Sequence, residues 1–297
     1  MSLGPIMIVG PGRMGTTLAA ALHDSGAFRE VVLAGRYPEP PDLPAWTDRF
    51  RYVFGLEHPP AGTLAVLLAI PEREVPDVAQ ALAALGPAPQ GCAVYHLSGV
   101  LPTDALEPLH HAGYVVGALH PLFFVPHSGG SPERIRDAWF SVTGGPDAVS
   151  VARVLVDSVE GRLIRVPAGR RATLHAAVAL TTSMMLPLLA RGLELMERAG
   201  VDGDEGLSSL ISLTRSTLDA IEVDGVSDAL RGPIAQGDVE TVGLHLRALD
   251  RGAARLYAAI GAEALGLAER GLEAGVSSQL EELLSRYLYP ETTGTNV

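Results

Sequence analysis

Hydrophobic residues follow two different patterns in the two parts of this chain. Up to about residue 166, short and nearly continuous apolar runs rich in Val, Ile and Leu alternate with helical stretches. The runs lie at residues 6–10, 31–34, 64–70, 93–97, 114–117, 139–142 and 161–166. Such runs, separated by helices, are typical of a parallel sheet that is covered on both faces. We therefore expect a doubly wound, mostly parallel α/β domain over residues 1–166.

After Pro167 the strand pattern stops, and apolar residues recur at intervals of three and four. This spacing predicts a long helix over residues 173–199, in which Pro187 should cause a kink or remove one backbone hydrogen bond. Further helices are expected near residues 205–222, 238–270 and 276–288. The second domain, residues 167–297, should therefore be all-helical.

The long predicted helix carries a broad apolar stripe. Its members include Met184, Met185, Leu188 and Leu189. This stripe offers more apolar surface than a small helical domain can cover, which favours a homodimer. Packing within a single chain is the alternative.

Composition narrows the environment and the partners. With 22 Lys and Arg against 34 Asp and Glu, the net charge of −12 disfavours nucleic acid and anionic membranes as partners. No run reaches the ~20 uninterrupted apolar residues of a membrane span, and the N-terminus lacks the basic region of a signal peptide. The single cysteine, Cys92, fits a reducing compartment and a place in the core. We therefore expect a cytoplasmic protein.

A glycine-rich turn follows the first apolar run and opens a predicted helix. It consists of Gly10, Pro11, Gly12, Arg13, Met14 and Gly15. In a Rossmann domain the first glycine permits a tight turn, the second lets the backbone approach a pyrophosphate, and the third allows close packing of helix and strand. The helix N-terminus would offer free N–H groups to the anion. We expect a dinucleotide site here; a glycine turn without a ligand is the alternative.

The end of the second strand indicates which nucleotide is bound. NAD-specific sites usually carry Asp or Glu at this point, whereas this chain has Arg36 after Gly35. An arginine would favour a 2′-phosphate, so the expected cofactor is NADP. An ordinary solvated loop arginine is the alternative. Ile70 and Pro71 end the strand that usually passes the nicotinamide ribose, and we expect them to make mostly backbone contacts.

Four segments together resemble a known superfamily. They are the turn at residues 10–15, residues 96–99, residues 120–122, and residues 175–177 together with 232–238. The chain is similar to NADP oxidoreductases that join a Rossmann domain to a helical domain like the C-terminal part of 6-phosphogluconate dehydrogenase. Pyrroline-5-carboxylate reductase, ketopantoate reductase and prephenate dehydrogenase are relatives, and the chain most resembles a branch with a conserved helical domain of unknown function. The resemblance implies hydride transfer to or from a small carbonyl, imine or hydroxy-acid substrate.

The chain departs from many of these relatives because it contains no lysine. Many of them place a proton-donating lysine on the first long helix after the sheet. His175 stands near the start of that helix here and is the natural replacement, since imidazole exchanges protons near neutral pH. The resemblance also implies an Asn eight residues further on, where this chain has Ser183, which can still form a hydrogen bond to a substrate.

Two further candidates follow predicted strands, at the edge where ligands bind in open α/β sheets. Ser98 could form a hydrogen bond to the substrate or to the cofactor, with Gly99 allowing close approach, or it could be a plain turn serine. His120 could contact the substrate or simply anchor its His-Pro turn, and His175 could be a structural helix histidine. No metal site is expected, because the adjacent His110 and His111 face different sides of a helix.

The loop at residues 231–238 admits two interpretations. Asp238 is well suited to cap the helix that follows. Alternatively, the loop covers the catalytic cleft and Arg231 binds an acidic group of the substrate.

Two other function classes remain open at this point. The chain could be an NADP-binding sensor or regulatory protein that has lost its chemistry, in keeping with the absent lysine. It could also be a purely structural dimerisation protein. Tight binding of NADP would exclude the second of these classes.

Overall fold

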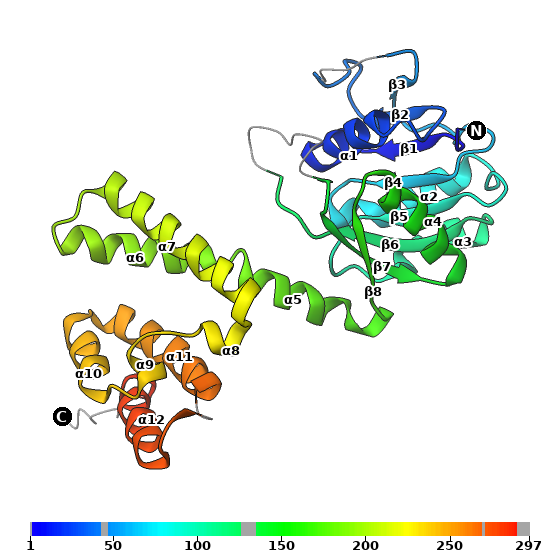
Figure 1. The fold of residues 1–297 in the computed structure, drawn as a ribbon. Coiled ribbons are helices and arrows are strands. Elements are labelled where there is room, and N and C mark those ends of the chain that lie inside the picture. The colour runs from blue at the N-terminus through cyan, green and yellow to red at the C-terminus, as the bar shows by residue number, and fades with distance from the viewer. Residues whose placement is uncertain (1, 43–46, 126–134, 269–270, 290–297) are drawn as a thin grey trace, which may run out of the picture. The chain divides into compact units, whose positions relative to one another are not determined.

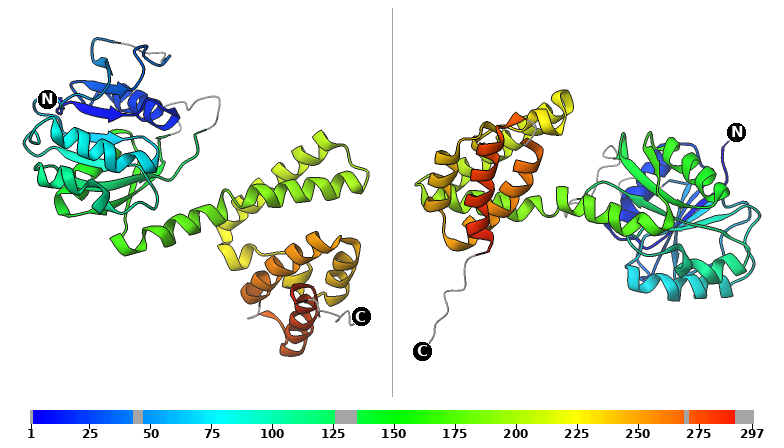
Figure 2. Two further views of the ribbon diagram at one scale, coloured as in Figure 1. Left: turned by 180° about the vertical axis from the view of Figure 1, so that it is seen from behind. Right: turned by 90° about the horizontal axis from the view of Figure 1, so that it is seen from below.

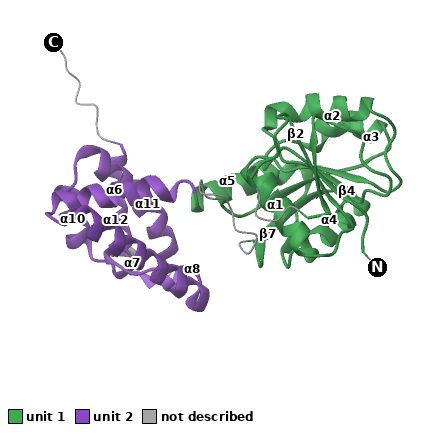
Figure 3. Ribbon diagram, turned by 90° about the horizontal axis from the view of Figure 1, so that it is seen from above, with its two compact units in different colours: residues 1–182 green, residues 183–297 purple. Residues whose placement is uncertain are grey.

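The computed structural model describes residues 2–42, 47–125, 135–268 and 271–289. The chain forms two compact units, residues 1–182 and 183–297 (Figure 3). The first unit contains the sheet, and the second is built from helices.

The first unit contains an eight-stranded sheet within the described residues (Figure 1). The strands are β1 (Ile6–Val9), β2 (Val31–Gly35), β3 (Phe50–Phe54), β4 (Ala65–Leu68), β5 (Ala93–His96), β6 (Val115–Pro121), β7 (Trp139–Gly144) and β8 (Arg162–Arg165). Their order in the sheet is β3-β2-β1-β4-β5-β6-β7-β8. Among these described strands, only the β6–β7 pair is antiparallel, so the expected mostly parallel sheet is confirmed.

Helices cover both faces of this sheet. Helices α1 (Arg13–Asp24) and α4 (Pro146–Ser158) pack with one core cluster, which contains Leu18 and Leu155. Helices α2 (Val75–Ala84) and α3 (Glu107–His111) pack with the other, which contains Leu82 and Leu109. The central strands are buried along their whole length, as a doubly covered sheet requires. This arrangement confirms the doubly wound fold, and Cys92 is buried in the second cluster.

The sequence pattern located seven strands and missed β3. This strand lies at the edge of the sheet, and only Phe50 among its residues is fully buried. Arg51 is exposed and pairs with Glu30 and Glu57 at 2.9 and 2.7 Å. An edge strand with one weakly covered face does not produce the continuous apolar run that marks a central strand.

The helix predicted over residues 173–199 is interrupted. Helix α5 (Arg171–Thr181) ends before residues 182–184, which form a turn, and α6 (Met185–Arg198) follows. Pro187 explains the break, because its nitrogen has no hydrogen to bond the carbonyl of Ser183 and its ring crowds that carbonyl. The expected effect of this proline is confirmed.

The break also separates the two compact units. The change from strands to helices occurs after β8, as expected near residue 167, but α5 still belongs to the first unit. The boundary of the compact units therefore lies at 182/183, beyond the 166/167 boundary expected from composition.

The longer helices that remain fall close to the expected segments. They are α7 (Gly203–Asp224), α10 (Val239–Ala248), α11 (Arg251–Ala268) and α12 (Ala274–Leu288). The short helices α8 (Val226–Ala229) and α9 (Pro233–Gln236) were not expected. The stretch expected as one helix over 238–270 divides at residues 249–250. Asp250 accepts a hydrogen bond from the backbone N–H of Ala253 at 2.9 Å and so starts a new helix. Asp238 caps α10 through the backbone N–H of Thr241 at 2.9 Å, as expected.

The second unit has its own core, but two of its helices contribute little to it. Helices α9 to α12 enclose a cluster that includes Ile234, Val242 and Leu280. Helices α6 and α7 lie side by side (Figures 1 and 2), yet no residue of α6 and only Gly206 of α7 is buried. Their outer faces are therefore uncovered in the single chain.

Candidate functional site

Two cavities lie at the carboxyl ends of the central strands, and both belong to the first unit. The larger, of about 530 Å³, is lined at β1, β2 and β4 by Gly10, Pro11, Gly12, Gly35, Arg36, Tyr37, Ile70 and Pro71, among others. The smaller, of about 240 Å³, is lined by Met14, Ala69, Ile70, Leu97, Ser98, His120 and Pro121. Ala69 and Ile70 line both cavities. The strand order reverses between β1 and β4, which is where ligands bind in open α/β sheets.

The glycine turn has the geometry of a dinucleotide cradle. Gly10 has a φ of +106°, and a Cβ at this position would overlap the carbonyl oxygen of Ala69. A Cβ on Gly15 would overlap the carbonyl oxygen of Gly10. A Cβ on Gly12, in contrast, would meet nothing within 4 Å. The first and third glycines thus allow close packing, and the second leaves space in front of the backbone.

Helix α1 begins directly behind this space. Gly12 is its N-cap, and no side chain caps the helix. The first N–H groups of α1, from Arg13 onward, are therefore available to an anion. The residues present fit the diphosphate of a dinucleotide.

Arg36 lies at the rim of the larger cavity. Its guanidinium carbon is 5.4 Å from the centre of the Tyr37 ring. In the described ranges, no carboxylate lies within ion-pair distance of Arg36. Tyr52 fixes the adjoining loop, because its hydroxyl donates a hydrogen bond to the Tyr37 carbonyl at 2.6 Å. This arrangement leaves the Arg36 charge available at the cavity rim.

The smaller cavity borders a pair of imidazoles. The rings of His120, from β6, and His175, from α5, have their centres 5.8 Å apart and are tilted by 53°. Gly99 lies beneath both rings: a Cβ there would overlap the His175 ring and would come within 3.0 Å of His120 Nε2. The structure therefore brings together His120 and His175, which lie 55 positions apart in the sequence.

The hydrogen bonds of His120 assign its tautomer. Its Nδ1 lies 2.9 Å from the carbonyl oxygen of Leu97, so Nδ1 carries the proton and Nε2 is the free acceptor in the neutral ring. Burial lowers the pKa of His120, and the charges of His175 and Arg171 act in the same direction. Glu72 and the Leu97 carbonyl oppose this change. Burial thus favours the neutral form of the His120 ring, which can accept a proton.

The Ser98 hydroxyl is fully used within the protein. It donates to Glu72 Oε1 at 2.5 Å and accepts from the N–H groups of Val100 and Leu101 at 3.1 and 2.8 Å. A hydroxyl has one donor and two acceptor positions, so none is left over in this arrangement. Glu72, in the short 3₁₀-helix Glu72–Glu74, is exposed and brings a carboxylate to the edge of the smaller cavity.

Arg171 is a buried cation that sequence reasoning overlooked. Its guanidinium donates a hydrogen bond to the carbonyl oxygen of Ser98, the neighbour of Gly99, and the residue is only 3% exposed. Burial lowers the pKa of its guanidinium, although the charge of Glu72 acts in the opposite direction. The available signal was its position four residues before His175, which places the two on one face of a helix.

His96 is a second buried residue beside this pair. It is 0% exposed, and among the described residues its ring nitrogens make no hydrogen bond of ordinary geometry, although the Pro102 backbone lies near enough to oppose the lowering of its pKa. Burial lowers its pKa to about 4, with a further contribution from the charge of Arg171. His96 is therefore a neutral core residue rather than a group that exchanges protons with the cavity.

Ser183, unlike Ser98, His120 and His175, does not belong to the first unit. It lies in the exposed turn between α5 and α6, at the first position of the second unit. Its expected contact with a substrate stays a prediction. Among the residues that the structure describes, no group of three His, Cys, Asp or Glu side chains could hold a metal ion.

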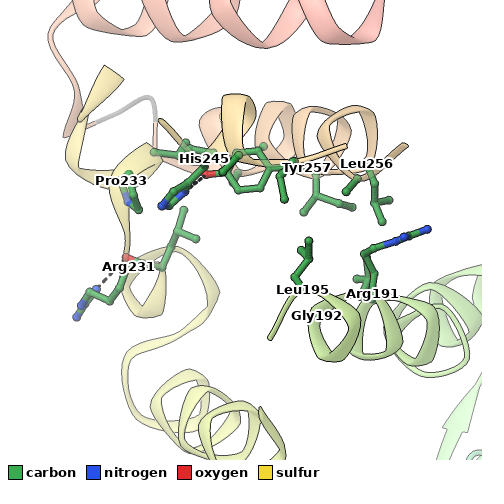
Figure 4. A pocket seen from close by; sticks show the side chains of 17 residues that line it. Arg191, Gly192, Leu195, Arg231, Pro233, His245, Leu256 and Tyr257 are labelled. Atoms are coloured by element: carbon green, nitrogen blue, oxygen red, sulfur yellow. Dashed lines mark hydrogen bonds between the residues drawn. The ribbon is translucent and has the colours of Figure 1, made fainter. Parts of the chain in front are cut away.

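The helical unit contains a cavity of a different character (Figure 4). Its volume is about 550 Å³, and its walls are mainly apolar side chains of α6, α10 and α11. His245 Nδ1 and the Tyr257 hydroxyl are paired with each other at 3.0 Å. Arg231 donates hydrogen bonds to the carbonyl oxygens of Asp228, in α8, and of the adjacent Leu230. The glycine turn and the His120–His175 pair lie in the sheet unit instead.

Comparison with known proteins assigns both parts of the chain. Residues 47–121 match a Rossmann-like domain, and residues 138–264 match a domain of unknown function, DUF2520. This pairing confirms the resemblance expected from the sequence. The second match includes His175 as well as β7, α4 and β8, so it crosses the boundary of the compact units. No curated protein sequence matches the chain.

Solved structures share the whole fold. A protein from Thermotoga maritima has a TM-score of 0.68 at 18% identity, covering 90% of this chain and 99% of that one. A candidate NADP oxidoreductase from Bacteroides fragilis has a TM-score of 0.65 at 19% identity, with coverages of 89% and 98%. Pyrroline carboxylate reductase from Plasmodium falciparum, solved with NADP bound, has a TM-score of 0.56 at 10% identity, with coverages of 96% and 97%. At these identities the likeness concerns the fold.

Proposed function

We propose that this chain, which joins a Rossmann-like domain to a helical domain of unknown function, is an NADP-dependent oxidoreductase. Its substrate would be a small carbonyl, imine or hydroxy acid. One observation carries the proposal: the glycine-turn cavity and the cavity beside the His120–His175 pair share Ala69 and Ile70. A dinucleotide that enters the first cavity would therefore reach the imidazoles with its other end. The P. falciparum reductase of similar fold, solved with NADP, also supports the proposal.

The cofactor would be held by the first unit. The open backbone at Gly12 and the N–H groups at the start of α1 suit its diphosphate, and Arg36 suits a 2′-phosphate. Ile70 and Pro71 would pass the nicotinamide ribose toward Met14 and the smaller cavity. When bound, NADP(H) supplies or accepts the hydride.

The chain itself must supply or remove one proton. We assign this step to His175, whose ring nitrogens make no hydrogen bond within the described residues. The neutral His120 ring presents its free Nε2 on the same side of Gly99 and would accept a hydrogen bond from the substrate or from His175. Ser98, with its hydroxyl bonded internally, would act by holding Glu72 and the loop after β5.

Two measurements test the function. The dissociation constants of NADPH and NADH are measured by nucleotide fluorescence, followed by turnover on a panel of small carbonyls, imines and hydroxy acids. His175→Ala and His175→Gln should keep NADPH binding and lose most turnover, whereas the exposed His111→Gln should behave as wild type. Full activity in both His175 variants would remove His175 from the mechanism.

An NADP-binding regulatory protein is the second candidate. The absence of lysine and the internal bonding of Ser98 support it. A protein of this class would bind NADPH tightly, yet it would not oxidise or reduce the nucleotide with any member of the panel.

We also propose a homodimer, formed through α6 and α7. The segment Ala168–Arg198 is long and apolar enough to cross a membrane, with a mean hydropathy of 1.5 in its most apolar window, and none of that window is buried. We propose that a second copy of the chain, rather than a bilayer, covers this apolar segment, because the segment is broken at residues 182–184 and Arg171 is anchored in the sheet unit. Light scattering should give twice the chain mass at micromolar concentration; a monomer there would refute the dimer.

We place the protein in the cytoplasm, in keeping with its single buried cysteine.

A further inference from the structure

Arg171 begins α5, and its guanidinium binds two other segments of the first unit, the loop after β5 and strand β7. Its Nε donates to the carbonyl oxygen of Leu101 at 3.2 Å and its Nη1 to Thr143 Oγ1 at 3.3 Å. Its Nη2 donates to the carbonyl oxygen of Ser98. The planar guanidinium carries five N–H donors on three nitrogens, so it can bind three separate oxygens in one fixed fork. Lysine has three donors on a single nitrogen, and glutamine has only two donors.

The remainder of α5 has little hold on the sheet. Arg171 is the single residue of this helix that is buried. His175 follows it by one helical turn on the same face, over Gly99, which is the neighbour of the Ser98 carbonyl that Arg171 binds. The position of the His175 ring is therefore tied to the Arg171 contacts.

We infer that Arg171 is a positioning residue, which docks α5 on β7 and on the loop after β5 and thereby holds the His175 ring against His120. The inference rests on the proposed function only for the use of the imidazole pair in proton transfer. The docking itself is independent of any reaction.

The charge of Arg171 gives this contact a second effect. Within the described ranges no carboxylate lies at ion-pair distance from the guanidinium. The groups that face His120 are His175 and Arg171 from α5, Glu72 from the loop after β4, and His96 from β5. Among them Arg171 and His175 lower the pKa of His120, and Glu72 raises it. Arg171 thus favours the neutral form of the His120 ring. In our inference it also maintains the contact of that ring with His175.

Nuclear magnetic resonance of the full chain can test both effects without a substrate. The variants are Arg171→Gln, which removes the charge, Arg171→Lys, which keeps the charge but not the fork of donors, and Arg170→Gln as an exposed neighbour control. The readouts are the pKa of His120, the ring-to-ring Overhauser contact between His120 and His175, and amide exchange along α5. Arg171→Gln should raise the pKa of His120, abolish the ring contact and speed exchange in α5. Arg171→Lys should lose the ring contact while the pKa of His120 stays low, and Arg170→Gln should match wild type.

A folded Arg171→Gln protein that keeps the ring contact and the wild-type pKa of His120 would overturn the inference. Should that variant not fold, Thr143→Val keeps the charge and removes one anchor. Faster exchange in α5 with an unchanged pKa of His120 would then support the inference, and wild-type exchange would overturn it. These outcomes are distinct from failure of the proposed function, which would appear as full turnover in the His175 variants.

Discussion

The centres of the His120 and His175 imidazole rings lie 5.8 Å apart, and both rings lie over Gly99, which has no side chain. This relationship gives the first prediction. In Gly99→Ala the new methyl group would overlap the His175 ring, and the two rings should separate. Overpacking of this kind costs about 1–3 kcal/mol of stability.

Turnover should fall in Gly99→Ala much more than NADPH affinity does, which steady-state kinetics and fluorescence titration can measure. Gly169→Ala is the matched control, because a Cβ there would meet nothing within 4 Å and the residue lies just before α5. Wild-type turnover in Gly99→Ala would show that contact between the rings is not required.

The second prediction separates the roles of two glycines in the nucleotide turn. Gly12→Leu should fill the open space before α1 and weaken NADPH binding by at least about tenfold, with the free energy of unfolding nearly unchanged. Gly15→Ala should instead lower the free energy of unfolding by about 1–3 kcal/mol, because its Cβ would overlap the Gly10 carbonyl. Urea unfolding and nucleotide titration distinguish the two. Equal NADPH affinity in Gly12→Leu and wild type would place the diphosphate elsewhere.

The third prediction concerns the choice of nucleotide. Removing the charge in Arg36→Gln should weaken NADPH binding by about 10- to 100-fold, since a charge-assisted hydrogen bond contributes about 1.5–3 kcal/mol, and should leave NADH binding unchanged. Arg51→Gln is the control, since Arg51 is already paired with Glu30 and Glu57. If wild-type protein binds NADPH and NADH equally, Arg36 does not select the nucleotide.

The fourth prediction concerns stability in acid. Burial lowers the pKa of His96 from 6.5 to about 4, so the unfolded chain takes up a proton before the folded chain does. The stability that neutral His96 contributes is therefore fully present above pH 6.5, and this contribution is lost as the pH falls toward 4. The contribution of this one group is about 3 kcal/mol.

His96→Leu should flatten the dependence of the urea midpoint on pH between 6.5 and 4. The exposed His111→Gln should leave that dependence as in wild type. An unchanged acid dependence in His96→Leu would assign the acid sensitivity to other groups.

The sequence predicted most of the fold because the signals were local. Seven strands appeared as apolar runs, and Pro187 marked the helix break. The edge strand β3 was missed because its single buried residue, Phe50, leaves no continuous run. The compact units divide beyond the change in composition, because the composition changes where the sheet ends, whereas Arg171 keeps the next helix attached to the sheet unit.

The candidate site could be predicted only in part. His120 and His175 could be named from motifs, but their contact depends on the way α5 returns to the end of β6. The roles of Glu72 and Arg171 depend on hydrogen bonds to groups distant in sequence, the Ser98 hydroxyl for Glu72 and the Ser98 carbonyl oxygen for Arg171. The Ser98 hydroxyl could be recognised as internally bonded only once Glu72 and the following N–H groups were placed.

The interruption at residues 182–184 determines which compact unit contains His175. Because α5 ends there, its imidazole shares a scaffold with the glycine turn. In the proposed reaction, the sources of hydride and proton would then be inherited together as one module. The helical unit could diverge in evolution toward new substrates or assemblies while the spacing of the reacting groups was conserved.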